Sequence, residues 1–190
     1  MVTEGNSINY LAKLEKELRD IPSDYIVFLE TSSDRFLEVS LAAIKLLTNK
    51  NDSGIIVSAN RPYKNLIDFY KRNNIDVSKM FILDCISKNQ FDTYNGGNVV
   101  FLENVSALTD ISLHLDERIK IMNGKKFLFI DSITTMLIHN DPHIFARFVH
   151  SVLTKMRLYG TGGLIISLEE KTNREIKAEI AQLCDKVIKI

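Results

Sequence analysis

A buried strand that ends in an acidic residue is the part of this sequence best suited to chemistry. In KKFLFIDSITTML, residues 125–137, an apolar run ends in Asp131, and Ser132 follows it. At the carboxyl edge of a parallel sheet, an aspartate can hold a magnesium ion, or water bound to that ion, beside a nucleotide phosphate. The aspartate could instead simply cap the next segment, and the residues alone favour these two interpretations about equally.

A second candidate site lies nearer the N-terminus. In YIVFLETSSDRFLEVSLAAIKLL, residues 25–47, an apolar run leads through a polar turn into a stretch with helical spacing. Many α/β proteins hold a nucleotide phosphate in such a strand–loop–helix unit. This loop, however, contains neither a glycine nor a G-K-[ST] sequence.

The spacing of apolar residues predicts the elements that position these two sites. Near-continuous apolar runs are typical of strands buried on both faces, and they alternate here with helical patterns. The sequence therefore predicts an α/β fold, a three-layer α/β/α sandwich with a mostly parallel central sheet. Strands are expected at 25–30, 54–58, 80–84, 99–103, 126–131, 163–168 and 186–190, and helices at 7–20, 34–49, 62–73, 108–123, 142–158 and 173–184.

One domain is expected over residues 1–190, because no linker, repeat or low-complexity tract interrupts the chain. Residues 1–21 form its N-terminal helix and residues 22–190 its core. Ser7 is the expected cap of that helix. Four apolar residues mark the face by which it should pack, Ile8, Leu11, Leu14 and Leu18.

The helix at 142–158 has clear boundary signals. Asp141 can cap its start, Pro142 suits its first position, and Gly160 suits its end.

Composition excludes several classes of function. Lysine plus arginine and aspartate plus glutamate both count 24, so a neutral chain argues against a broad nucleic-acid or anionic-membrane surface. No apolar run is long enough to span a bilayer, and the N-terminal residues lack the pattern of a signal peptide. Cys85 and Cys184 lie in separate apolar segments and are expected to pack as free thiols. A cytoplasmic protein is expected.

In their order along the chain, four segments resemble the RecA-like ATPase core, and more closely its archaeal KaiC-like branch. They are FLFIDSITTML, FVHSVLTKMRLYGTGGLIISLEE, RPYKNLIDFYKRNNIDVSKMFILDCIS and EIAQLCDKVIKI. The resemblance covers nearly the whole chain after residue 22. It implies a RecA-like P-loop NTPase topology in which strand 163–168 lies between strands 25–30 and 126–131.

The resemblance also implies a phosphate-binding loop, the Walker A loop G-x-x-x-x-G-K-[ST], after the first strand. Aligned on Glu30, its two glycines fall on Thr31 and Phe36, its lysine on Leu37 and its hydroxyl on Glu38. A Cβ at the glycine positions hinders close backbone approach, and leucine supplies no positive charge. At an effective dielectric of about 20, a carboxylate about 4 Å from a phosphate charge is repelled by roughly 4 kcal/mol. We interpret the loop as a degenerate Walker A, whose remnants are Thr31, Ser32, Ser33, Asp34, Arg35, Phe36, Leu37 and Glu38.

The family's catalytic glutamate, which orients the attacking water, is also missing. The corresponding stretch is GIIVSANRPY, in which Asn60 and Arg61 stand near the position of that glutamate. Neither side chain can act as a general base at neutral pH. Arg61 could contact an anion, although a solvated loop charge is the more common role of such a residue.

These losses predict a catalytically inactive RecA/KaiC-like protein that acts as a regulatory or scaffolding partner. We expect no cofactor, a protein partner, no membrane or nucleic-acid partner, and a monomer or homodimer rather than a ring. In the alternative hypothesis, the protein is a KaiC-like ATP-binding protein or ATPase whose remodelled nucleotide site holds Mg-ATP through Asp131 and a rearranged loop. Asp131 would then be the ligand of any metal, and Asn60, Asp131 and Ser132 are the other remnants of the nucleotide site. A DNA-binding role fits poorly with zero net charge.

Other polar residues carry weaker signals. His139, His143 and His150 lie near Asp141, but no short ligand pair favours a metal cage. Asp84 ends a strand and could line the same sheet edge as Asp131.

Overall fold

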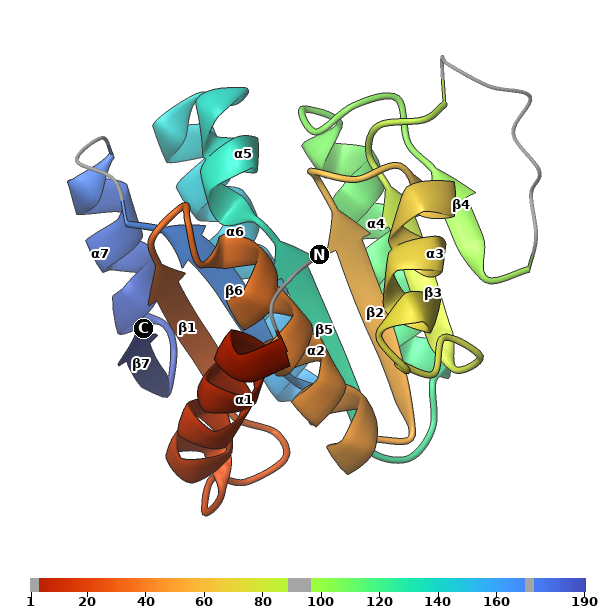
Figure 1. The fold of residues 1–190 in the computed structure, drawn as a ribbon. Helices are drawn as coiled ribbons and strands as arrows, with labels where there is room; N and C mark the ends of the chain where they lie inside the picture. The colour runs from red at the N-terminus through yellow and green to blue at the C-terminus, as the bar shows by residue number, and fades with distance from the viewer. Residues whose placement is uncertain (1–3, 89–96, 170–172) are drawn as a thin grey trace.

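A computed structural model describes residues 4–88, 97–169 and 173–190, with side chains from residue 10 onward. Within these ranges, seven strands form one parallel sheet in the order β4-β3-β2-β5-β6-β1-β7 (Figure 1). Their bounds are β1 Ile26–Thr31, β2 Ser53–Ser58, β3 Met80–Asp84, β4 Val99–Phe101, β5 Lys126–Asp131, β6 Gly162–Leu168 and β7 Lys186–Lys189. The expected strands are confirmed, with shifts of one or two residues at some ends.

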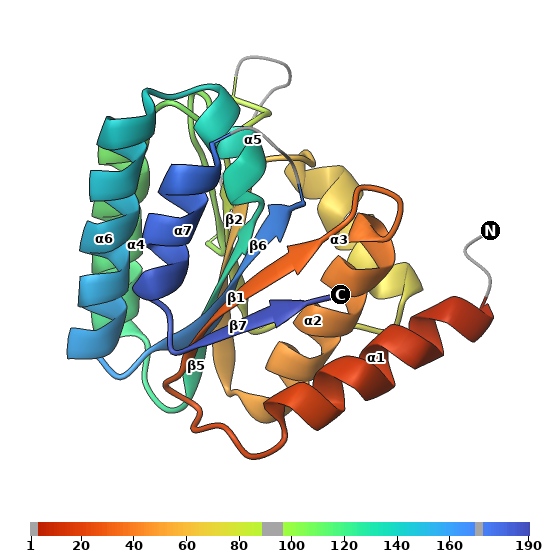
Figure 2. The same cartoon turned by 90° about the vertical axis from the view of Figure 1, so that its left-hand side faces the viewer.

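Helices cover both faces of this sheet, which confirms the predicted three-layer α/β/α sandwich (Figures 1 and 2). One apolar core lies between the sheet and α1, α2 and α3, and a second lies between the sheet and α4, α5, α6 and α7. The helices are α1 Glu4–Leu18, α2 Phe36–Lys50, α3 Tyr63–Arg72, α4 Leu108–Ile121, α5 Ile133–Ile138, α6 Pro142–Leu158 and α7 Arg174–Gln182.

The predicted position of β6 between β1 and β5 is confirmed. Ile26 of β1 pairs with Gly163, and Phe127 of β5 pairs with Gly162. Both glycines are required by close packing, because a Cβ at Gly162 would collide with the carbonyl oxygen of Ser23 and one at Gly163 with that of Leu128. The backbone that leads into β1 and the backbone of β5 can therefore approach β6 only where it lacks side chains.

The boundary signals of α6 are confirmed. The Asp141 carboxylate accepts hydrogen bonds from the amides of His143 and Ile144 at 3.0 and 2.9 Å, and Pro142 is the first helical residue. Gly160 lies just beyond the helix with a φ of +57°, a conformation that glycine adopts without strain.

The first helix differs from its prediction. It begins at Glu4 and ends at Leu18, so Ser7 lies inside the helix and the expected cap at Ser7 is wrong. Leu14 and Leu18 are buried against the α2 side of the core, and Leu11 is half-buried; the side chain of Ile8 lies outside the described ones.

Two lysines bind the end of α1 to the rest of the protein. Lys50 of α2 donates a hydrogen bond to the Leu18 carbonyl at 2.7 Å, and Lys186 of β7 lies 2.9 Å from a Glu17 carboxylate oxygen. The N-terminal helix is thus held by both apolar packing and polar contacts.

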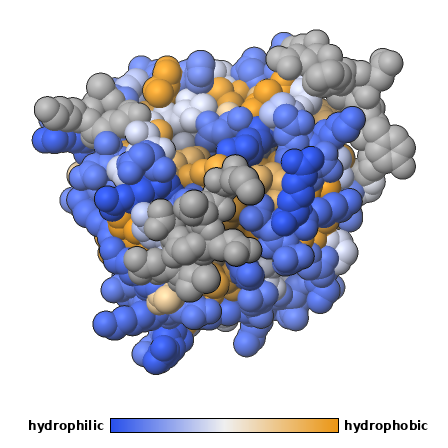
Figure 3. Space-filling view, in the orientation of Figure 1, coloured by the Kyte–Doolittle hydropathy of each residue, from blue (hydrophilic) through white to orange (hydrophobic). Residues whose placement is uncertain are grey.

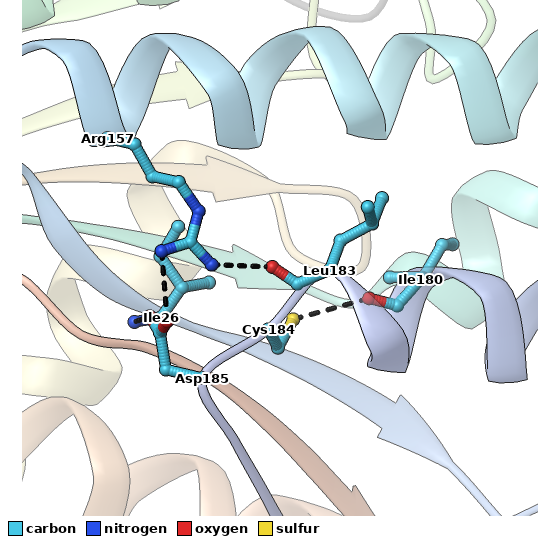
Figure 4. A network of polar contacts seen from close by, with 6 residues as sticks. All are labelled: Ile26, Arg157, Ile180, Leu183, Cys184 and Asp185. Carbon is cyan, nitrogen blue, oxygen red and sulfur yellow. Dashed lines mark hydrogen bonds and ion pairs between the residues drawn. The ribbon is translucent and has the colours of Figure 1, made fainter.

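A compact polar network fixes the turn into β7 (Figure 4). The Arg157 guanidinium donates to an Asp185 carboxylate oxygen at 2.9 Å and to the Leu183 carbonyl at 2.7 Å. The other Asp185 oxygen accepts from the Ile26 amide at 2.8 Å. This network joins the end of α6 to β1 and sets the register of β7 beside it.

Both cysteine thiols are free. Burial raises the pKa of Cys85 and of Cys184 to about 12, so neither thiol is an activated nucleophile. The Cys184 thiol lies 3.4 Å from the Ile180 carbonyl oxygen (Figure 4).

The face that carries α1, α2 and α3 is mostly hydrophilic, with apolar residues visible between charged ones (Figure 3). In the part of the chain that the structure describes, no helix is long and apolar enough to cross a membrane.

The packing of α1 gives a first testable prediction. Leu14 is fully buried, so Leu14→Ala removes apolar contacts and leaves a cavity, and we expect the free energy of unfolding to fall by about 2–5 kcal/mol. Urea denaturation followed by circular dichroism measures this loss. The matched control is Leu158→Ala at a leucine that is 75% exposed, where a change of less than about 0.5 kcal/mol is expected. Equal effects of the two substitutions would show that α1 does not pack as described.

Candidate functional site

The carboxyl edge of the sheet brings together polar residues from distant parts of the chain. In the strand register, Ser58 at the end of β2 pairs with Asp84 at the end of β3 and with Asp131 at the end of β5. All three side chains are buried. The expectation that Asp84 shares an edge with Asp131 is confirmed.

Asp131 lies at the end of a short hydrogen-bond chain. The side-chain amide of Asn60 donates to Asp131 Oδ1 at 3.2 Å, and the Thr135 hydroxyl donates to Asn60 Oδ1 at 2.6 Å. Asn60, which lies near the expected position of the catalytic base, is therefore hydrogen-bonded to Asp131, the residue that the alternative hypothesis assigns to a metal. Sequence reasoning missed Thr135, whose hydroxyl fixes the orientation of the Asn60 amide.

Burial dominates the electrostatics of Asp131, which is 3% exposed. Loss of solvent raises the pKa of this carboxyl from its ordinary value of 3.8 to about 6, against the opposing effects of the Asn60 hydrogen bond and the Arg61 charge. The ionised form is thus poorly solvated and has one neutral hydrogen-bond donor.

Ser132, and not Asp131, caps the segment that follows. Its hydroxyl accepts a hydrogen bond from the Thr135 amide at 3.5 Å at the start of α5. The interpretation of Asp131 as the cap is therefore wrong. The peptide bond between Asp131 and Ser132 is cis.

Asp84 serves the local backbone. Its carboxylate accepts hydrogen bonds from the amides of Tyr63, Ile86 and Ser87 at 2.6–3.1 Å and from the Ser87 hydroxyl at 2.6 Å. These contacts occupy both oxygens and join the turn after β3 to the start of α3. Asp84 is therefore a structural residue at this edge.

The loop between β1 and α2 makes its polar contacts within itself. The amide of Arg35 donates to the Ser32 carbonyl at 3.2 Å, and Arg35 and Asp34 form an exposed contact of 3.7 Å with each other. Ser33 is exposed, whereas Thr31 is 1% exposed and its hydroxyl has no hydrogen-bond partner among the described residues.

The start of α2 has no side-chain cap. Arg35 occupies the cap position without a side-chain hydrogen bond, and Glu38 lies in the first turn. A carboxylate there interacts favourably with the partial positive charge of the helix N-terminus. Phe36 packs against the core on the α1–α2 side, and Leu37 is half-buried beside it.

Arg61 packs against an aromatic ring. Its guanidinium carbon lies 4.7 Å above the ring centre of Phe69, while its carbonyl accepts a hydrogen bond from Ser58 at 2.7 Å. The buried Tyr70 lies in the same electrostatic environment, since burial, and then the Asp131 charge, raise the pKa of its hydroxyl. The pattern of residues in the sequence did not indicate a role for Tyr70.

A hydroxyl pair joins α5 to the end of β6. The hydroxyls of Thr134 and Ser167 lie 3.2 Å apart, and the Leu168 amide donates to Thr134 at 2.8 Å. Both side chains are buried. This contact orients α5, and with it Thr135, over the carboxyl edge.

The three histidines do not lie with other metal-ligating residues. His139, His143 and His150 are all exposed. In residues 4–88, 97–169 and 173–190, the structure brings no three His, Cys, Asp or Glu side chains together as a metal site.

Comparison with known proteins identifies the fold. No family model matches the chain, and no curated protein matches it. Three similar solved structures come from the archaeon Pyrococcus horikoshii OT3. PH0321, an uncharacterised protein in complex with an unknown peptide, has a TM-score of 0.67 and 14% identity over 94% of this chain and 82% of its own.

The other two are similar over most of their length. PH0250 has a TM-score of 0.59 and 13% identity over 93% of this chain and 86% of its own. The KaiC-like protein PH0186 has a TM-score of 0.57 and 13% identity over 89% of this chain and 72% of its own. The chain therefore has the KaiC-like α/β fold that its sequence pattern predicts.

The buried carboxyl of Asp131 gives a second prediction. Because its folded pKa, about 6, exceeds the ordinary value of 3.8, the folded state binds more protons than the unfolded state between these values. The cost of the ionised form is therefore present above about pH 6 and disappears as the pH falls towards 4. We expect Asp131→Asn to raise the free energy of unfolding by up to about 3 kcal/mol at about pH 7, with much less gain at about pH 4.

Denaturation at a series of pH values measures this effect, with Asp68→Asn on the exposed surface of α3 as the control. A gain from Asp131→Asn that is the same at both ends of the pH range would contradict the raised pKa.

Proposed function

We propose that this protein is a RecA/KaiC-like regulatory or scaffolding partner that does not hydrolyse ATP. The observation that carries the proposal is the hydrogen bond from Asn60 to Asp131, backed by Thr135. In this arrangement an amide stands where the family resemblance implies a catalytic base. An amide has no basic site for the proton of an attacking water.

The same hydrogen bond opposes magnesium binding. A hard cation needs an ionised carboxylate oxygen that is free to accept it. Burial raises the pKa of Asp131 to about 6, so the carboxylate is ionised at neutral pH, but the Asn60 amide occupies one of its oxygens. Magnesium would have to displace that amide or bind the other oxygen, and in either case give up part of its water shell to reach a buried side chain.

The loop after β1 supports the proposal independently. It supplies no lysine at Leu37 and no hydroxyl at Glu38, where the family loop would contact phosphate and metal. Glu38 already places a carboxylate at the positive end of α2, and a phosphate there would meet like charge. The residues of this edge therefore do not fit Mg-ATP as the family holds it.

A protein partner is part of the proposal. The similar structure of PH0321 was solved with a peptide, so a chain of this fold can accommodate a polypeptide ligand. Zero net charge and the free thiols favour a partner protein in a reducing cytoplasm over nucleic acid or membrane.

Calorimetric titration with Mg-ATP tests the proposal. We expect no measurable heat of binding for the unaltered protein, because the loop and Asp131 lack the groups that hold phosphate and metal. The double variant Leu37→Lys/Glu38→Thr restores both contacts in principle, and any binding gained should appear only in this variant. Both positions are half-buried at the start of α2, so circular dichroism must show that the variant folds.

The matched control is Asp131→Ala. Micromolar binding by the unaltered protein that Asp131→Ala abolishes would overturn the proposal and establish a remodelled ATP site at Asp131 and Ser132.

A further inference from the structure

The outer surface of α4 and α6 has the properties of an interface. These two helices pack side by side in the layer that faces away from α1, α2 and α3 (Figure 2). A groove of about 480 Å³ runs between them, and Leu108 and Phe148 line its floor. Leu113 on α4 and Ile144 on α6 line the same groove and are 54% and 51% exposed. Ile144 is part of the apolar stripe by which its helix was expected to pack on the sheet, and yet it faces solvent.

The two helices carry opposite charge. Between residues 142 and 158, α6 has no acidic residue and contains Arg147, Lys155 and Arg157. By contrast, α4 is net acidic, since its three carboxylates, Asp110, Asp116 and Glu117, outnumber its two bases, Arg118 and Lys120. The Arg118 guanidinium is directed over the Phe81 ring at 3.7 Å, which leaves the outer face of α4 more acidic still.

Helical spacing places these groups in two matching stripes. Asp110, Leu113 and Glu117 are three and four residues apart, so they share one exposed face of α4. Ile144, Arg147 and Ser151 have the same spacing on α6 and are also exposed. Each stripe thus combines one large apolar residue with charge of one sign.

The two helices also run in the same direction. Each leads from the carboxyl edge of the sheet back to the start of a parallel strand, α4 to β5 and α6 to β6. A two-fold axis parallel to both helices, in the plane of their outer surface, would therefore set α4 of one copy on α6 of the other.

We propose that this surface binds a second copy of the chain in a symmetric homodimer. Leu113 and Ile144 of both copies then become buried, and Arg147 of each copy faces Asp110 of the other. Arg147 is available for this contact, because it has no ion-pair partner within the described ranges. Lys155, by contrast, is already 3.8 Å from Asp116 of its own chain.

A second copy fits better than an unrelated partner because the surface is complementary to itself. In a two-fold dimer both subunits contribute the same patch. Here the patch carries basic residues on α6 and acidic residues on α4, so each helix meets the opposite charge on the other copy. The groove is small and much of the complementarity is polar, so we expect micromolar rather than nanomolar self-association that weakens as salt is added.

Charge-swapped chains test the dimer by sedimentation velocity over a concentration series. One chain carries Arg147→Glu, and the other carries Asp110→Arg/Glu117→Arg. Each alone would place like charges across the interface, so each should be monomeric at concentrations where the unaltered protein dimerises. Mixed together, the two chains have attractive contacts at both symmetry-related positions and should form a heterodimer.

An apolar substitution supplies a second measurement that depends on the same geometry. Leu113→Asp should weaken dimerisation by about tenfold or more, since it places a buried charge at the centre of the interface. Val187→Asp is the matched control on β7, where a half-exposed side chain lies at the far edge of the sheet, and it should leave the dimer unchanged. Circular dichroism verifies that each variant folds.

The proposal is overturned if the unaltered protein sediments as a monomer throughout the series. It is equally overturned if a dimer forms but neither charge reversal nor Leu113→Asp weakens it.

Discussion

The position of β6 between β1 and β5 is the constraint on which the rest of the structure depends. It needs two consecutive glycines, Gly162 and Gly163, because neighbouring backbone leaves no room for a Cβ at either position. With strands about 4.8 Å apart, this insertion separates the loop after β1 from Asp131 at the end of β5 by about 10 Å. The same strand also holds α5 over the edge through the Ser167–Thr134 hydroxyl pair.

On the other side of β5, its pairing with β2 brings the Asn60 amide within reach of a buried carboxylate. A buried acidic group is stable when it has hydrogen-bond donors, a metal ion or a proton, and Asp131 has one amide donor and a raised pKa. The Asn60 amide therefore compensates the Asp131 charge only in part, which is why the pKa stays raised. At this sheet edge the polar groups are directed at one another, from Thr135 to Asn60 and from Asn60 to Asp131.

The elements could be predicted from the sequence where local signals agreed. The parallel strands are continuous apolar runs, and α6 begins at Asp141–Pro142 and ends before Gly160, so all were identified without the structure. Short α5 was missed because the six residues of ITTMLI are too few to show helical periodicity. The cap at Ser7 was wrong because α1 continues three residues further towards the N-terminus.

The site could be predicted only in part, for a physical reason. Asp131, Asn60 and the altered loop are visible as residue types at expected positions, but the contact between Asn60 and Thr135 spans 75 residues of sequence. Nothing local in the sequence distinguishes a threonine that orients an amide from one that is merely solvated. The burial of Asp131, which sets its pKa, likewise depends on how the helices close over the sheet.

The most direct measurement is the thermal unfolding midpoint of the unaltered protein with magnesium alone and with magnesium and ATP. A ligand that binds only the folded state must stabilise it, by about 2.7 kcal/mol at one hundred times its dissociation constant. If the carboxyl edge and the loop after β1 do not hold the nucleotide, millimolar Mg-ATP will give the same unfolding midpoint as magnesium alone. A midpoint that rises with ATP concentration, and does not rise in Asp131→Ala, would contradict this conclusion.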